Sequence, residues 1–273
     1  MFIDTHCHLN IIAPKQPLEP LQEHHFPAID QAITEAALAG VKTIINVGTD
    51  LIESAASVMI AQRYKGVFAT VGVHPTDCNE LPQSTRDTVQ ALRSWLLEKE
   101  HNKIVGVGEI GLDFYHKPYD EQKQKDYCRA QIELALAHKL PVVIHVREAA
   151  DEMLRLLEEY VKQGLRGVLH CFQQQQYVAE QACGWGLMVG LDAPINYPKN
   201  AWLREVFKQI PLEHIVLETD APFLPPQAMR GKQNKPAYIP LIAQELAMIK
   251  AVDVAVIEQQ TTANAQQLFN LKY

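Results

Sequence analysis

Histidine and carboxylate side chains occur repeatedly near the ends of short apolar segments in this 273-residue sequence. Imidazole nitrogens and carboxylate oxygens are common protein ligands of divalent transition metals. Burying such groups together without a cation costs free energy, because the carboxylates lose their hydration. We therefore expect a metal centre whose ligands are His6, His8, Glu109, His145, His170 and Asp220.

The number of these groups favours two metal ions over one. Six protein ligands exceed what a tetrahedral zinc ion binds while keeping one position open, but they suit two ions that share a carboxylate. Glu109 is the predicted bridge. Two ions about 3.5–4 Å apart lower the pKa of a shared water molecule and stabilise the attacking and the leaving oxygen, so the predicted chemistry is hydrolysis.

The elements that position these side chains follow the pattern of a parallel α/β protein. Short segments rich in Val and Ile alternate with longer segments of helical periodicity. Strands are expected at 2–8, 43–48, 67–74, 104–110, 142–146, 167–171, 187–191 and 215–219, and helices at 28–39, 85–100, 121–139, 148–163 and 201–209, among others. Eight such units in about 250 residues fit a closed (β/α)8 TIM barrel. Because no linker or repeat divides the chain, we predict a single domain over residues 1–273.

In such a barrel every candidate ligand falls at the carboxyl end of a strand, which is the catalytic face of barrel enzymes. Side chains two residues apart on a strand point the same way. His6 and His8 are therefore expected to face the interior together, with Cys7 toward the helices. The same rule places Arg147 on the face of His145, where its guanidinium either clamps a substrate phosphate or forms a salt bridge at the rim.

Other polar residues are expected to have supporting or surface roles. Glu218 and Asp4 lie one layer deeper than the ligands on their strands and are expected to orient neighbours. Asp113 is expected to act in the same way or to lie in a loop. His24 and His25 are expected to be solvated. Proline-rich loops are expected at 10–27 and 222–240.

Composition restricts the class of protein. The chain is 47% hydrophobic with a formal charge of -7, which argues against broad adhesion to nucleic acid or anionic membranes but leaves a local basic groove open. No apolar run approaches the roughly 18–20 residues of a spanning helix, and the start of the sequence lacks a signal peptide pattern. The five cysteines are widely spread and are expected to be reduced. These features predict a cytoplasmic protein without a membrane or a stable protein partner.

Six motifs follow one another along the chain: DTHCHL at 4–9, GVHP at 72–75, VGEIGLDF at 107–114, IHVRE at 144–148, HCF at 170–172 and ETDAPFL at 218–224. Together they resemble the TatD family of metal-dependent deoxyribonucleases, which belongs to the metal-dependent hydrolase barrels. The tail, with KPAYIP at 235–240 and TTANAQQLF at 261–269, is also similar to the family. The match covers nearly the whole chain.

The resemblance implies a role for each matched residue. One ion would be held by His6, His8 and Asp220, the other by His145 and His170, with Glu109 between them. Asp220 would also orient or deprotonate the attacking water, and His74 would lie near the substrate phosphate. Four imidazoles favour Zn²⁺, Mn²⁺, Co²⁺ or Ni²⁺, whereas the resemblance also implies Mg²⁺, so the identity of the two ions stays open.

Three functions remain open from the sequence. The resemblance implies a 3'-5' exonuclease type of deoxyribonuclease. A barrel mouth favours single-stranded DNA or frayed ends, because bases must be separated before the backbone enters. The alternative is a C–N or ester hydrolase, such as an amidohydrolase or an aminoacyl-tRNA deacylase, since the same water attacks carbonyls. A barrel that binds nucleic acid or protein without catalysis is disfavoured by the complete ligand set.

Overall fold

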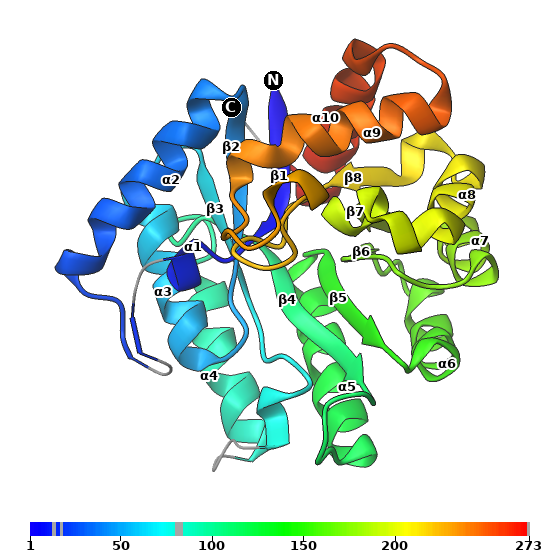
Figure 1. Ribbon diagram of the computed structural model, residues 1–273. Helices are drawn as coiled ribbons and strands as arrows, with labels where there is room; N and C mark the ends of the chain where they lie inside the picture. The colour runs from blue at the N-terminus through cyan, green and yellow to red at the C-terminus, as the bar shows by residue number, and fades with distance from the viewer. Residues whose placement is uncertain (13–14, 17–18, 80–83, 272–273) are drawn as a thin grey trace.

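The structure, a computed structural model, describes residues 1–12, 15–16, 19–79 and 84–271. In this part of the chain, eight parallel strands form one sheet in sequence order. The barrel closes between the first and last strands, where His8 N–H donates to the carbonyl of Ala221 at 2.8 Å and Asp220 N–H donates to that of His6 at 2.9 Å. The predicted TIM barrel is confirmed (Figure 1). The strands are β1 Phe2–Cys7, β2 Val41–Val47, β3 Val67–Val71, β4 Ile104–Asp113, β5 Val142–Arg147, β6 Gly167–Leu169, β7 Met188–Leu191 and β8 Ile215–Leu217.

Helices surround the strands, and short polar side chains mark where several of them begin. Asp50, Ser84, Asp120 and Asp253 each accept a backbone N–H from the first turn of the helix that follows. None of the described helices is both long enough and apolar enough to cross a membrane. The helices are α1 Leu9–Ile12, α2 Phe26–Leu38, α3 Leu51–Arg63, α4 Thr85–Leu97, α5 Glu121–His138, α6 Ala150–Val161, α7 Gln176–Gly184, α8 Ala201–Gln209, α9 Ile239–Lys250 and α10 Val254–Phe269.

The end of the chain fills one end of the barrel. Leu268 and Phe269 of α10 pack in one buried cluster with Ile3, Val143 and Val216, which come from β1, β5 and β8. Side chains from β1, β5 and β8 can meet in one cluster only in the interior of the barrel. A larger cluster packs the outer faces of the strands against the helices. With this end filled by apolar side chains, the polar residues gather at the opposite end.

Several predicted strand ends are wrong by a few residues. β1, β3, β6 and β8 stop before His8, His74, His170 and Asp220, whereas β4 runs past its predicted end to Asp113. The chain turns sharply at Asp220, whose φ of 56° lies in the left-handed region. The polar side chains therefore lie in the turns that leave the sheet as well as on the strands.

The predicted loop at 10–27 contains helical turns. Its residues 13–14 and 17–18 lie outside the described part. The expectation that His24 and His25 are both solvated is wrong for His25, which is 1% exposed. Its Nδ1 accepts the backbone N–H of Gln22 at 3.0 Å. The ring packs at the start of α2 because this hydrogen bond ties it to the turn before the helix.

Candidate metal centre

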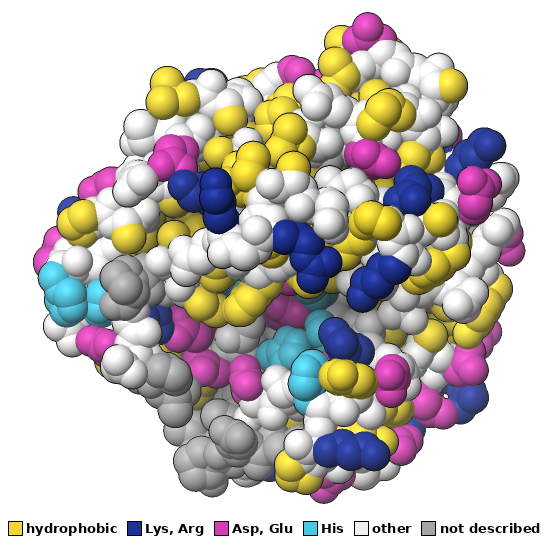
Figure 2. All heavy atoms as spheres, in the orientation of Figure 1, with side chains coloured by type: hydrophobic (Ala, Val, Ile, Leu, Met, Phe, Trp, Pro, Cys, Tyr) yellow, Lys and Arg dark blue, Asp and Glu magenta, His cyan; other side chains and the backbone are white. Residues whose placement is uncertain are grey.

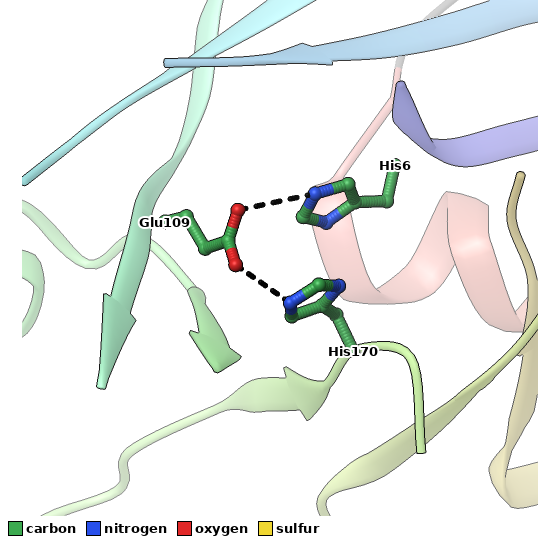
Figure 3. A group of neighbouring side chains, drawn as sticks. All are labelled: His6, Glu109 and His170. Atoms are coloured by element: carbon green, nitrogen blue, oxygen red, sulfur yellow. Dashed lines mark ion pairs between the residues drawn. The ribbon is translucent and has the colours of Figure 1, made fainter. Parts of the chain in front are cut away.

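The carboxylate of Glu109 lies between two groups of histidines. Glu109 belongs to β4 and is 3% exposed. Its Oε2 is 3.3 Å from Nε2 of His6, and its Oε1 is 2.7 Å from Nε2 of His170. Figure 3 shows the carboxylate between the two rings, with one oxygen toward each. A single carboxylate thus connects the ends of β1 and β6 across the barrel.

The first group contains His6, His8 and Asp220. The Nε2 atoms of His6 and His8 are 3.1 Å apart, and Oδ1 of Asp220 is 3.5 Å and 3.3 Å from them. Nδ1 of His8 lies 3.0 Å from the carbonyl oxygen of Val47. Because a carbonyl only accepts, Nδ1 carries the proton and the lone pair of Nε2 points into the group.

The second group gathers around the other oxygen of Glu109. Nδ1 of His145 is 3.1 Å from Oε1 of Glu109 and 3.3 Å from Nε2 of His170. Nε2 of His74 is 3.4 Å from the same oxygen. His74, expected near the substrate phosphate, therefore lies among the candidate ligands themselves. All six predicted ligands and His74 are brought together at this centre.

Asp113 orients His145 from outside the centre. Its Oδ2 accepts a hydrogen bond from Nε2 of His145 at 3.0 Å, which leaves the lone pair of Nδ1 for the centre. The same oxygen is 2.9 Å from Nδ1 of His116. Asp113 is fully buried and belongs to no group of ligand atoms in the described chain, in agreement with the supporting role expected from the sequence.

Glu218 lies behind the ring of His170 but makes no hydrogen bond to it. Its Oε1 lies 3.8 Å from Nδ1 of His170 and accepts the backbone N–H of Cys171. The room for this carboxylate depends on Gly190 of β7, because a Cβ there would lie 2.4 Å from Oε1 of Glu218. Sequence reasoning placed Glu218 beneath Asp220 but missed the requirement for glycine across from it.

Burial and charge set the protonation of the central groups. Burial raises the pKa of Glu109, but the neighbouring imidazoles, led by His170, outweigh burial and hold the pKa well below its ordinary value. Burial lowers the pKa of His6 to about 4. Near neutral pH the bridging carboxylate is ionised and His6 is neutral, which are the forms that bind metal.

The donor set fits divalent transition metals. Ligand atoms around a tetrahedral ion with metal–nitrogen distances of about 2.0–2.1 Å lie about 3.3 Å apart, and the distances within the first group run from 3.1 to 3.5 Å. The lone pairs of His8 and Asp220 face each other, and this arrangement is repulsive unless a cation or a proton lies between them. A cation at this point satisfies all three donors at once.

A cavity of about 830 Å³ opens above these groups. Figure 2 shows histidine and acidic side chains at the bottom of a hollow, with Lys and Arg side chains around its rim. Arg147 lines the cavity as expected, with its guanidinium carbon 4.2 Å from the centre of the Tyr115 ring. Sequence reasoning missed Lys199 and Phe223, which also line it. Lys199 lies in none of the six motifs. Phe223 belongs to the motif ETDAPFL, but the sequence indicates no role for it.

The sequence matches a family model described as TatD related DNase over residues 3–270. The chain belongs to the TatD family. Relatives in this family include the uncharacterized metal-dependent hydrolase YabD of Bacillus subtilis, 30% identical, with 99% of this chain and 100% of that protein covered. The 3'-5' ssDNA/RNA exonuclease TatD of Erwinia tasmaniensis is 33% identical, with 89% and 93% covered.

Solved TatD structures have the same fold. The crystal structure of YJJV, a TatD homolog from Escherichia coli, superposes with a TM-score of 0.88 at 28% identity and covers 99% of this chain and 98% of that one. Together, the family match, the metal-dependent relatives and the donor groups around Glu109 establish a metal-dependent hydrolase of the TatD family.

Proposed function

We propose that this TatD protein is a 3'-5' exonuclease that hydrolyses phosphodiester bonds of single-stranded DNA or frayed DNA ends with two divalent metal ions. The observation that carries the proposal is the position of Glu109, which has one carboxylate oxygen in each of two donor groups. The similarity to the 3'-5' ssDNA/RNA exonuclease TatD of Erwinia tasmaniensis supports this substrate class. In this proposal residues 1–273 act as a single catalytic domain.

The proposed ligands divide between the two oxygens of Glu109. His6, His8 and Asp220 would hold one ion, His145 and His170 would hold the other, and Glu109 would connect the two groups. Bound there, the ions would lower the pKa of a water molecule and stabilise charge on the attacking and leaving oxygens. Which of Zn²⁺, Mn²⁺, Co²⁺, Ni²⁺ and Mg²⁺ binds there depends on which of these ions is available to the protein.

The side chains around the centre have distinct tasks in the reaction. Asp220 accepts a proton from the attacking water, since its carboxylate lies at the edge of the cavity and is ionised near neutral pH. Burial raises the pKa of Asp220, but the neighbouring imidazoles of His8, His6 and His170 lower it overall. His74 contacts the substrate phosphate from beside Glu109, with its Nε2 3.4 Å from Oε1 of that carboxylate. Attack forms a new P–O bond and breaks the bond between phosphorus and the 3'-oxygen of the preceding nucleotide. That oxygen takes up a proton and leaves as the 3'-hydroxyl of the shortened strand, and a nucleoside 5'-monophosphate is released.

Cations at the rim attract the strand even though the chain carries a formal charge of -7. Arg147 and Lys199 line the cavity on the β5 and β7 sides of the barrel. Their charges lie in the cavity that a phosphodiester would enter, whose lining also includes the carboxylates of Asp77 and Glu148. Acidic residues elsewhere on the surface weaken the attraction little, because Coulomb interactions beyond about 8–10 Å are screened at physiological salt.

Arg147→Met tests the phosphodiester assignment. Losing a planar, bidentate phosphate ligand is expected to lower kcat/KM on single-stranded DNA by about 10- to 100-fold, with metal content unchanged because Arg147 is not a ligand. The salt dependence of binding should fall by a slope of about one. Arg155→Met, an exposed arginine of α6, is the matched control. Wild-type cleavage by Arg147→Met across a salt titration would count against a phosphodiesterase.

Asp113→Asn tests how His145 is oriented. Without the buried carboxylate, His145 is no longer fixed with its Nδ1 lone pair toward Glu109, so metal affinity should fall by about 10- to 100-fold. Activity should return at higher metal concentration, because the side chains that bind the metal directly are intact. Metal titration by calorimetry checks this, with the exposed Asp126→Asn of α5 as control. An unchanged metal affinity would show that Asp113 is not needed to position the ring.

A further inference from the structure

Phe223 presents an aromatic ring beside the metal centre that the proposed reaction does not use. It follows β8, lines the cavity and is 48% exposed. The centre of its ring is 5.9 Å from that of His8, with the two planes at 67°. An exposed aromatic ring forgoes about 25 cal/mol of burial free energy for each Å² left in water. Its position suggests a partner that arrives with the substrate.

The backbone around Phe223 is fixed by hydrogen bonds. Phe223 N–H donates to the carbonyl of Asp220 at 2.9 Å, which closes a turn directly after the ligand. The buried side chain of Asn234 donates to the carbonyls of Thr219 at 2.6 Å and Leu224 at 3.2 Å. These contacts tie the segment on both sides of the ring to the loop before α9. The ring is therefore attached to an ordered backbone at a set distance from Asp220.

The ring shares its cavity with cations. Arg147 and Lys199 line the same cavity. Figure 2 shows hydrophobic side chains next to Lys and Arg side chains around the rim of the hollow. Proteins that hold single-stranded nucleic acid combine cations that follow the backbone with aromatic rings on which bases stack. A small amide or ester offers no repeated anion to match these cations.

We propose that Phe223 is a stacking platform for the nucleobase of the terminal nucleotide, whose phosphate lies at the metal centre. The inference rests on the proposed function and assigns a base-binding site to it. Every base has a π-face, so stacking there holds the terminal nucleotide with little sequence preference. By stacking on the terminal base, the ring positions the phosphate of the same nucleotide at the metal centre.

Affinity for matched oligonucleotides tests this site apart from catalysis. The metal-loaded protein is titrated with single-stranded DNA that carries a phosphorothioate at its last linkage, ending either in a normal nucleotide or in an abasic residue. Phe223→Ala removes the ring, Phe223→Leu keeps an apolar side chain without a flat face, and Phe223→Trp keeps an aromatic face. Tyr177→Ala of α7, 49% exposed and outside the cavity lining, is the matched control.

For the normal oligonucleotide, Phe223→Ala and Phe223→Leu are expected to raise Kd by about 5- to 150-fold, the effect of losing one base–aromatic stack. Phe223→Trp and Tyr177→Ala should stay near wild type, and all five proteins should bind the abasic oligonucleotide alike. Equal weakening of both oligonucleotides by Phe223→Ala, or no weakening of either, would overturn the stacking site. A wild-type protein that binds neither oligonucleotide would instead overturn the proposed function, and the base site with it.

Discussion

Glu109→Ala is expected to lower kcat/KM by about 10³-fold or more, because removing the bridge forfeits several kcal/mol of metal-dependent stabilisation. Each oxygen of Glu109 faces a separate donor group, so the substitution affects both ions. Metal analysis should give two ions per chain for the wild type and fewer than one for the variant. Activity assays and elemental analysis on the same samples check both expectations.

Two controls accompany this substitution. Glu148→Ala removes a carboxylate that also lines the cavity but belongs to no donor group in the described chain, and it should keep both ions. Circular dichroism of Glu109→Ala should match the wild type, because the barrel packing does not depend on this carboxylate. Full turnover by Glu109→Ala at saturating metal would rule out the bridging role.

Asp220→Asn is expected to reduce kcat by about 10²- to 10⁴-fold, the usual contribution of a positioned general base. An amide oxygen still reaches His8 and His6, so metal binding should weaken much less than catalysis, and KM should change little. Steady-state kinetics at saturating metal separate the two effects. If kcat stays at the wild-type level, another group accepts the proton and the role of Asp220 is limited to binding.

Much of the centre was predictable because parallel strands bring their carboxyl ends to one face. His6, Glu109 and His145 lie on strands whose apolar patterns are clear, and barrel closure brings them together without further information. His8 and Asp220 were placed equally well although they lie beyond their strands, because the turns that carry them leave the same rim.

Side-chain alternation was less reliable on β1. Strict alternation from His6 turns Ile3 toward the helices, but the register shifts between Asp4 and Cys7, and Ile3 packs in the interior cluster. Asp4 accepts hydrogen bonds from the backbone N–H of Thr219 at 3.0 Å and from its hydroxyl at 2.6 Å, as expected of a residue that orients a neighbour. A bulge reverses the alternation, and no local sequence pattern marks this one.

Contacts between segments that are distant in the chain could not be predicted from the sequence. The space that Gly190 leaves for Glu218 and the hydrogen bond from Asn234 to Thr219 join residues from different strands and loops. Such contacts depend on how the strands are staggered around the barrel, which periodicity does not specify. The burial of His25 was missed for a related reason, since a hydrogen bond within the turn, and not the polarity of the segment, decides it.

Hydrolysis by chelator-stripped protein, with one metal re-added at a time, tests the central claim most directly. The substrates are single-stranded DNA, blunt duplex DNA, RNA and a library of amides and esters. We predict that single-stranded DNA is degraded from its 3' end to nucleoside 5'-monophosphates only when metal is restored, and faster than blunt duplex. Metal-dependent turnover of an amide or ester with single-stranded DNA left intact would contradict the account.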